Sequence, residues 1–314
     1  MGKRRILITG SLGQIGTELA LYFKKIYGAS NILATDISDK NVDALEDIKY
    51  EPLDVTDGKR IHELVTNYKI DTIVNLAAIL SATGEKIPQK TWEINMGGLV
   101  NVLDVALQEK CTVFTPSSIA AFGESTPKDN TPQVTIQRPN TMYGVTKVAG
   151  ENLCDYYNLR FGLDTRGVRY PGIISYKTLP GGGTTDYAVH IYFEALRNKK
   201  YKSFIAEGTK MDMMYMPDAL KAVVDLIEAD PSKLKNRNAF NITAMSFAPE
   251  DLEVAIKKHI PEFVLEYEVD PERQAIADSW PNSLDDSAAR EEWGWSPDYD
   301  IDAMTEDMLK NIKI

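Results

Sequence analysis

The sequence contains few residues of the kinds that bind metal ions or form disulfide bonds. Among 314 residues it has two cysteines, Cys111 and Cys154, and three histidines, His62, His190 and His259. None of them shows the close spacing that is typical of a metal site. We therefore expect no metal ion, two buried free thiols and a reducing compartment, with the cytoplasm as the default.

The sequence also lacks a long apolar run and an excess of positive charge. No run reaches the roughly 18 apolar residues of a candidate membrane span, and the apolar run after the basic start MGKRR is too short for a signal peptide. The net charge of −11 at pH 7 disfavours nucleic-acid and anionic-membrane partners. It does not exclude a phosphate-bearing cofactor, because backbone N–H groups can bind phosphate without basic side chains.

Short β-branched stretches alternate with longer amphipathic ones in the first half of the chain. Strands are expected at 4–9, 30–36, 48–54, 71–78, 111–118 and 164–172, and helices at 14–28, 57–69, within 88–108 and from Tyr143 onward. Apolar strands that alternate with helices predict an α/β fold, namely a Rossmann-type doubly wound parallel sheet with helices on both faces.

The alternation weakens after Gly172. Further helices are expected after the glycine run 181–183 and at 217–230 and 249–260, and a strand at 238–243, whereas the tail is rich in Trp, Pro and Asp. We assign 1–172, with returning elements near 215–245, to a nucleotide-binding Rossmann domain. Residues 173–214 and 246–314 are assigned to a smaller C-terminal substrate lobe.

Three glycines follow the first predicted strand and open the next helix with the spacing G-x-x-G-x-x-G. In such a loop Gly10 permits a sharp turn, Gly13 lets a pyrophosphate approach the backbone, and Gly16 lets the helix pack on the sheet. The helix N-terminus then favours an anion. The predicted phosphate-binding loop is completed by Leu12, Gln14 and Ile15. A purely structural turn is the alternative interpretation.

Acidic residues follow the second and third predicted strands. Asp36 lies 20 residues after Gly16, where a carboxylate binds a ribose 2′-hydroxyl and repels a 2′-phosphate, and no arginine follows it closely. This favours NAD over NADP. Asp54 is a candidate for contact with the adenine edge, and its alternative role is a polar cap of the next helix. Further cofactor contacts are assigned to Leu53, Val55, Leu76, Ala77 and Ala78.

Hydroxyl, phenol and ammonium groups follow the later strands. Ser117 and Ser118 end the fifth predicted strand, and Tyr143 opens the next helix with Lys147 one turn further on the same face. A Tyr followed four residues later by a Lys also arises by chance in a chain with this many of both, so the pair is informative only in this setting. Together these groups would surround a nicotinamide bound at the glycine loop.

These motifs resemble those of the extended short-chain dehydrogenase/reductase family. The matching segments are TGSLGQIG, Asp36, NLAA, SSIAAFG and YGVTK. Most of the chain further resembles a narrower group, the short-chain type of NAD-dependent L-threonine 3-dehydrogenases. The segments that carry this likeness are LSATGEK, TPSSIAAFG, NTPQVTIQRPNTMYGVTK, PGGGTTDYAV, MDMMYMPDA and DSWPNSLDDSAAREEWGW.

The resemblance implies oxidation of L-threonine to L-2-amino-3-oxobutanoate with formation of NADH. Tyr143 would then act as the base, because a neighbouring ammonium such as Lys147 and a bound nicotinamide cation favour its phenolate. Lys147 would also hold the ribose hydroxyls. Ser118 takes the position of the hydroxyl that binds the reacting oxygen, and Ser117 supports it. The alternative for both serines is that they only bond to turn backbone groups.

The resemblance also assigns contacts to the substrate and to the nicotinamide. Backbone N–H groups together with Thr184 or Thr185 would bind the substrate carboxylate, and the resemblance points to Thr185; a plain helix cap is the alternative. Ser81 would face the amino acid, and Trp280 would form a wall over it, unless it is ordinary packing. Asn95 would support the catalytic helix or the cofactor, or else lie on a helix surface. The nicotinamide carboxamide would be flanked by Tyr170, Pro171 and Ile173.

Two other functions remain open on the sequence alone. The first is a nucleotide-sugar epimerase or dehydratase of the same fold, which would need a site for a second pyrophosphate. The second is a non-catalytic NAD sensor. The family resemblance further implies a homodimer that forms through the helices near 88–108 and 141–161.

Overall fold

The computed structural model describes residues 4–177 and 183–314, and contacts divide the chain into two compact units. The first unit contains the residues up to Ala121 together with Asn140–Arg169 and Leu220–Phe240. The second unit contains Phe122–Pro139, Tyr170–Ala219 and Asn241–Ile314. The predicted domain boundaries left 122–139 in the nucleotide-binding domain. In the structure this segment bonds within the second unit, where the amide of Asn241 donates to the carbonyl of Thr131 at 3.0 Å.

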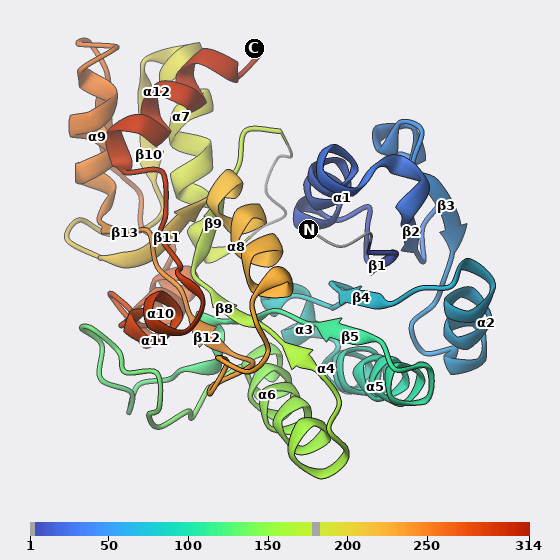
Figure 1. The fold of residues 1–314 in the computed structure, drawn as a ribbon. Helices are drawn as coiled ribbons and strands as arrows, with labels where there is room; N and C mark the ends of the chain where they lie inside the picture. The colour runs from blue at the N-terminus through green and yellow to red at the C-terminus, as the bar shows by residue number, and fades with distance from the viewer. Residues whose placement is uncertain (1–3, 178–182) are drawn as a thin grey trace. The chain divides into compact units, whose positions relative to one another are not determined.

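A six-stranded sheet forms the centre of the first unit (Figure 1). Its strands are β1 (Ile6–Thr9), β2 (Ile32–Asp36), β3 (Lys49–Pro52), β4 (Thr72–Asn75), β5 (Thr112–Phe114) and β7 (Thr165–Arg166). They lie in the order β3-β2-β1-β4-β5-β7, and every neighbouring pair is parallel. The predicted doubly wound parallel sheet is therefore confirmed. All four residues of β1 and of β4 are buried, which explains why the apolar residues of these strands are consecutive rather than alternating.

Six α-helices lie in the connections between these strands, and a seventh follows them later in the chain. They are α1 (Gln14–Tyr27), α2 (Gly58–Tyr68), α3 (Ser81–Lys86), α4 (Pro88–Trp92), α5 (Gly98–Glu109), α6 (Met142–Phe161) and α8 (Met216–Glu228). The helix α1 ends at Gly28, as predicted, and this glycine has a φ of +85° that disfavours other residues. The helix predicted within 88–108 is present as α4 and α5, with the π-helical turn Glu93–Gly97 between them.

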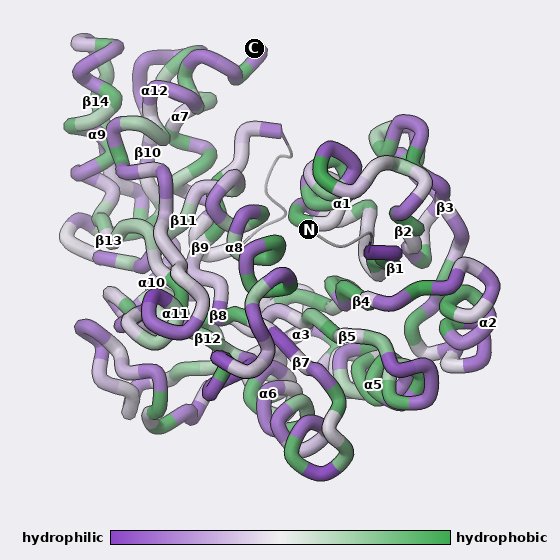
Figure 2. The backbone as a smooth tube through the Cα atoms, viewed as in Figure 1, coloured by the Kyte–Doolittle hydropathy of each residue, from purple (hydrophilic) through white to green (hydrophobic). Residues whose placement is uncertain are grey.

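A hydrophobic core packs α2, α5 and α6 against the sheet of the first unit. Both green and purple segments occur along α5 in Figure 2, as expected for a helix with one buried face. Cys111 and Cys154 both lie in this core and form no disulfide. The prediction of buried free thiols is confirmed, and burial raises the pKa of the Cys111 thiol to about 12.

Two of the predicted strands are broken into shorter ones. The stretch 111–118 forms β5 and then β6 (Ser117–Ser118), and 164–172 continues from β7 into β8 (Val168–Tyr170) and β9 (Gly172–Ile174). Pro116 has no N–H to donate, and a Cβ at Gly167 would lie 2.3 Å from the carbonyl oxygen of Thr115. The strand β8 lies between β12 (Phe240–Asn241) and β6, so the two serines belong to a separate three-stranded sheet.

The second unit contains two small sheets and five helices among the described residues. Its strands are β9, β10 (Lys200–Ser203), β11 (Met211–Tyr215), β13 (Met245–Phe247) and β14 (Val264–Tyr267), and its helices are α7 (Tyr187–Asn198), α9 (Pro249–Lys257), α10 (Pro271–Ser279), α11 (Ser287–Trp293) and α12 (Ile301–Asn311). The elements after 260 were not predicted. They are short, and α10 and α12 begin at the aspartate caps Asp270 and Asp300 rather than at a long apolar pattern.

Candidate functional site

The glycine loop between β1 and α1 is closely packed. Gly10 has a φ of +66°, and a Cβ there would lie 2.8 Å from the backbone nitrogen of Ala77. A Cβ at Gly16 would lie 2.2 Å from the carbonyl oxygen of Gly10. Any side chain at these two positions would collide with backbone, so the loop requires glycine for close packing of strand, turn and helix.

The loop presents the N-terminus of α1. Gly13 caps this helix without a side-chain acceptor, and the first N–H groups of a helix have no partner inside it. The N–H groups of Gln14, Ile15 and Gly16 are therefore available to an anion at the positive end of the helix dipole. The donor set fits the pyrophosphate of a dinucleotide, which needs backbone donors and close approach.

Asp36 lies at the end of β2 beside this loop. Its Oδ2 accepts the backbone N–H of Leu12 at 3.0 Å, and its Oδ1 accepts that of Ser38 at 3.1 Å. The carboxylate is half-buried, so it keeps accessible acceptor capacity for a ribose hydroxyl. The position fits the predicted selection of NAD.

Asp54 follows β3 and lies between the buried side chains of Leu53 and Val55. Its Oδ1 accepts the backbone N–H of Thr56 at 2.9 Å and the hydroxyl at 2.8 Å, and these bonds hold the pKa of the carboxyl below its usual value. The alternative role as a cap of the next helix is wrong, because Asp57 caps α2. Contact between Asp54 and adenine stays a proposal.

The segment after β4 is bonded to the strand beside it. The backbone N–H of Leu76 donates to the carbonyl of Thr9 at 3.2 Å, and that of Ala77 donates to the Thr9 hydroxyl at 3.2 Å. Ala77 and Ala78 line a small pocket of about 40 Å³ together with Lys147. Ser81 lies further along as the first residue of α3 and is half-buried.

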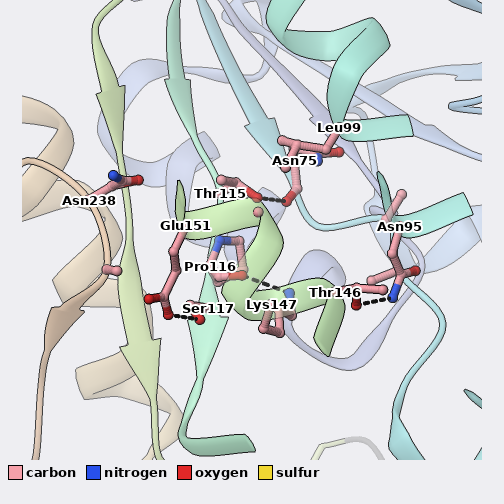
Figure 3. A pocket seen from close by; sticks show the side chains of 14 residues that line it. Asn75, Asn95, Leu99, Thr115, Pro116, Ser117, Thr146, Lys147, Glu151 and Asn238 are labelled. Carbon is pink, nitrogen blue, oxygen red and sulfur yellow. Dashed lines mark hydrogen bonds between the residues drawn. The ribbon is translucent and has the colours of Figure 1, made fainter. Parts of the chain in front are cut away.

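Asn95 lies in the π-helical turn between α4 and α5. Its Oδ1 accepts the N–H of Ile79 at 2.8 Å, and its Nδ2 donates to the carbonyl of Ile79 and the hydroxyl of Thr146, both at 3.1 Å. These bonds join the segment after β4 to α6, and Figure 3 shows the amide directed toward Thr146. The alternative of a free helix-surface asparagine is wrong. Single π-helical turns within α-helices are frequent at functional sites.

Tyr143 and Lys147 lie one turn apart on α6. The Lys147 ammonium lies 5.2 Å from the centre of the Tyr143 ring and donates to the carbonyl oxygen of Pro116 at 2.7 Å. The hydroxyl of Thr141 caps α6 by accepting the N–H of Gly144 at 3.1 Å. The carboxylate of Glu85 accepts the N–H of Met142 at 2.6 Å. The first turn of α6, which carries the phenol, is thus held by two acceptors.

The two serines of β6 differ in their bonding. The Ser117 hydroxyl donates to the buried carboxylate of Glu151, whereas the Ser118 hydroxyl accepts the N–H of Ala120 at 3.2 Å. No bond to another described residue uses the Ser118 hydroxyl proton. Ser118 is therefore the serine that can donate to a reacting oxygen.

The remaining predicted contacts belong to the second unit. Thr184 and Thr185 form a 3₁₀ turn before α7, but the turn is capped by the carboxylate of Asp186, which accepts the N–H of Gly183. Neither threonine hydroxyl bonds to another described residue, so the cap of this turn is formed by Gly183 and Asp186 rather than by a threonine. Part of the glycine run before them, 178–182, lies outside the described residues.

Tyr170 and Trp280 are both buried within the second unit. The Tyr170 hydroxyl donates to the carbonyl of Ala219 at 2.8 Å, and burial raises the pKa of its phenol. Trp280 follows α10 as its C-cap residue. Pro171 is buried and Ile173 is half-buried in and beside β9. Whether these side chains contact a nicotinamide or a substrate stays a proposal.

Sequence reasoning missed Glu85, Glu151 and Arg169. Glu151 follows Lys147 by four residues, so the spacing that singled out Tyr143 and Lys147 also places Glu151 on the same helix face. No comparable signal exists for Arg169, because its partner comes from another element.

The described residues contain no cluster of three or more His, Cys, Asp or Glu side chains that could hold a metal ion. Within the same part of the chain, none of the helices has the length and apolar character of a bilayer span.

Residues 6–243 match the NAD dependent epimerase/dehydratase family. The chain belongs to this family. It is the extended short-chain dehydrogenase/reductase type that the sequence motifs indicated. NAD is the cofactor, and the protein is an oxidoreductase of the family rather than a non-catalytic sensor.

Several solved structures of the family are similar to this chain over nearly its whole length. The L-threonine dehydrogenase of Clostridium difficile is 60% identical with a TM-score of 0.98, covering 99% of this chain and 98% of that one. The GalE-like L-threonine dehydrogenase of Cupriavidus necator is 47% identical with a TM-score of 0.94, covering 98% of this chain and 100% of that one.

Other relatives leave the substrate open. An uncharacterized epimerase/dehydratase of Staphylococcus saprophyticus is 58% identical over 99% of this chain and 97% of its own length. The UDP-glucose 4-epimerase of Thermotoga maritima has a TM-score of 0.82 at 20% identity, a likeness that shows the fold alone.

Proposed function

We propose that this family member oxidises the 3-hydroxyl of L-threonine with NAD, giving L-2-amino-3-oxobutanoate. The observation that carries the proposal is the extent of the likeness to L-threonine dehydrogenases. The family match ends at residue 243, whereas the Clostridium and Cupriavidus enzymes align over 99% and 98% of the chain. The likeness therefore includes the residues after 243, which belong to the unit that holds the proposed substrate contacts.

The geometry of β6 and α6 supports hydroxyl oxidation. NAD, when bound, supplies the acceptor for the hydride of the threonine β-carbon. Tyr143 takes the hydroxyl proton as the carbonyl forms, and the Lys147 ammonium lies on the same helix face, 5.2 Å from the centre of the Tyr143 ring. Ser118 donates its unused hydroxyl proton to the reacting oxygen, where negative charge develops.

The second unit supplies the proposed contacts to the amino acid. Thr184 and Thr185 have hydroxyls without partners in the described part of the chain, and a carboxylate accepts from such donors. Trp280 forms an apolar wall. Ser81 on α3 of the first unit is a further proposed contact.

The decisive experiment follows NADH absorbance with purified protein, NAD and a panel of L-threonine, L-serine and UDP-glucose. L-Threonine should give NADH, and a chelator should leave the rate unchanged if no metal takes part. UDP-galactose formed from UDP-glucose, with no NADH from any amino acid, would make the protein an epimerase instead.

A pair of phenylalanine variants on one helix tests the role of Tyr143. Tyr143→Phe should lower kcat by about 100-fold or more, as expected when a proton-transfer group is removed. Tyr156→Phe is the matched control, because Tyr156 lies on α6 but is exposed. Similar rates for both variants would remove Tyr143 from the mechanism.

A further inference from the structure

The face of α6 that carries Tyr143 forms hydrogen bonds with Pro116, just before β6, and with Ser117 in β6. Tyr143, Lys147 and Glu151 are spaced four residues apart, so they share one side of the helix. Lys147 donates to the carbonyl of Pro116, and Glu151 accepts the hydroxyl of Ser117. Two successive helix turns thus hold two successive residues of the segment that ends at Ser118 (Figure 3).

Glu151 also binds a third element. The Nε of Arg169 in β8 donates to Oε1 at 3.0 Å, and its Nη2 donates to Oε2 at 2.8 Å. Each of the two side chains is only 7% exposed. A two-pronged guanidinium–carboxylate pair has a defined geometry, so one carboxylate ties α6 to the paired strands β6 and β8.

This side-chain anchor adds to the pairing of β6 with β8 in holding the segment around Ser117. Pro116 cannot donate a backbone hydrogen bond, and a pocket of about 40 Å³ adjoins it, lined by Ser117, Lys147 and Glu151 among others. This space exceeds the roughly 10–15 Å³ that a single water needs. Without the anchor, the Pro116–Ser118 segment has room to shift.

We infer that Glu151 is a positioning residue of this enzyme, and that Ser117 is part of the same anchor and takes no part in the chemistry. The inference rests on the proposed function. Through Ser117 and Arg169, Glu151 fixes the distance between the Ser118 hydroxyl on β6 and Tyr143 and Lys147 on α6. The adjacent serines therefore have separate roles: Ser117 holds the strand, and Ser118 contacts the reacting oxygen.

The test compares Ser117→Ala, Glu151→Gln and the double variant, using the substrate of the panel that the wild-type protein turns over. Each single change should lower kcat by about 10- to 100-fold, the cost of a small misplacement, and leave the pH profile unchanged. The double variant should be no slower than the slower single variant, because both changes act on the same anchor. Ser118→Ala should cost about 100-fold or more, and adding Ser117→Ala to it should cost little more, because the hydroxyl that the anchor positions is then already absent.

Two controls separate anchoring from general damage. Ser117→Thr keeps the hydroxyl, and the adjoining pocket has room for the added methyl, so it should retain the wild-type kcat. Asp155→Asn changes a carboxylate one turn beyond Glu151, whose partner is Asn238 rather than the Pro116–Ser118 segment. It should leave kcat unchanged.

Amide hydrogen exchange provides a readout that needs no turnover. In Ser117→Ala and Glu151→Gln the amide hydrogens of residues 117–121 should exchange faster than in the control Asp155→Asn. If Glu151→Gln does not fold, Ser117→Ala alone provides this comparison. A wild-type kcat together with wild-type exchange in Ser117→Ala would overturn the inference. A shifted pH profile in either single variant would also overturn it, as would a loss in the Ser117→Ala/Glu151→Gln double variant equal to the product of the two single losses. Failure of the wild-type protein to oxidise L-threonine would instead count against the proposed function, while the exchange result would still decide the anchor.

Discussion

The backbone N–H of Leu12 donates to Oδ2 of Asp36 at 3.0 Å. One carboxylate therefore fixes the glycine loop to the end of β2, and we propose that the same group binds a ribose hydroxyl. Loop geometry and nucleotide choice are coupled through this side chain.

Asp36→Asn should weaken the preference for NAD over NADP. The amide oxygen can still accept from Leu12, but the negative charge that repels a 2′-phosphate is gone. The ratio of kcat/KM with NADP to that with NAD should rise about tenfold or more, which corresponds to about 1.4 kcal/mol. Asp39→Asn is the control, since Asp39 is exposed three residues further along. An unchanged ratio in Asp36→Asn would contradict the assignment.

Gly16→Ala should destabilise the fold and weaken cofactor binding. The added Cβ would lie 2.2 Å from the Gly10 carbonyl oxygen, and such overpacking costs about 1–3 kcal/mol. Gly97→Ala is the matched control, because a Cβ there has no neighbour within 4 Å. Urea unfolding without NAD and a fluorescence titration with NADH measure the two effects. Equal stability of both variants would show that the loop tolerates a side chain.

Asp212 should make the stability of the second unit depend on pH. Its carboxylate accepts the hydroxyl of Thr243 at 2.6 Å and the N–H of Leu284 at 2.8 Å, yet burial raises its pKa to about 8. The folded state therefore holds a proton that the unfolded chain, with a pKa of about 3.9, releases. This contribution to stability is complete below about pH 4 and is lost as the pH rises toward about 8.

The free energy of unfolding of Asp212→Asn, minus that of the wild-type protein, should therefore rise between pH 5 and pH 9. Asp230→Asn is the control that should show no change over this range, because hydrogen bonds from Ser232 lower the pKa of Asp230 and its carboxyl is ionised in both the folded and the unfolded state above about pH 5. If the difference in free energy of unfolding between Asp212→Asn and the wild-type protein does not change with pH, the raised pKa of Asp212 is refuted.

Self-association through α6 is expected from the apolar side chains that this helix leaves exposed. Leu159 is 85% exposed, and Tyr156 and Phe161 are also exposed near it. Clustered exposed apolar residues are typical of interfaces. Leu159→Glu should shift a dimer to a monomer in sedimentation or light scattering. Val254→Glu on α9, also at an exposed apolar position, should not. A monomeric wild-type protein at micromolar concentration would refute the homodimer.

The sequence by itself determined the elements whose signals are local. Gly10, Gly13 and Gly16 after an apolar strand predicted the loop, and Gly28 predicted the end of α1. These hold because turn geometry, helix caps and strand burial depend on a few consecutive residues.

Only the tertiary structure decided which residues that are distant in the sequence form hydrogen bonds with one another at the site. In the structure Ser117 donates to Glu151, and Glu151 also accepts from Arg169. The amide of Asn95 donates to the Thr146 hydroxyl, and Asp57 rather than Asp54 caps α2. The tertiary structure also broke two predicted strands, at Pro116 and at Gly167 and Pro171. Hydrogen bonds of buried side chains depend on which elements meet in space, and spacing along one chain does not contain that information.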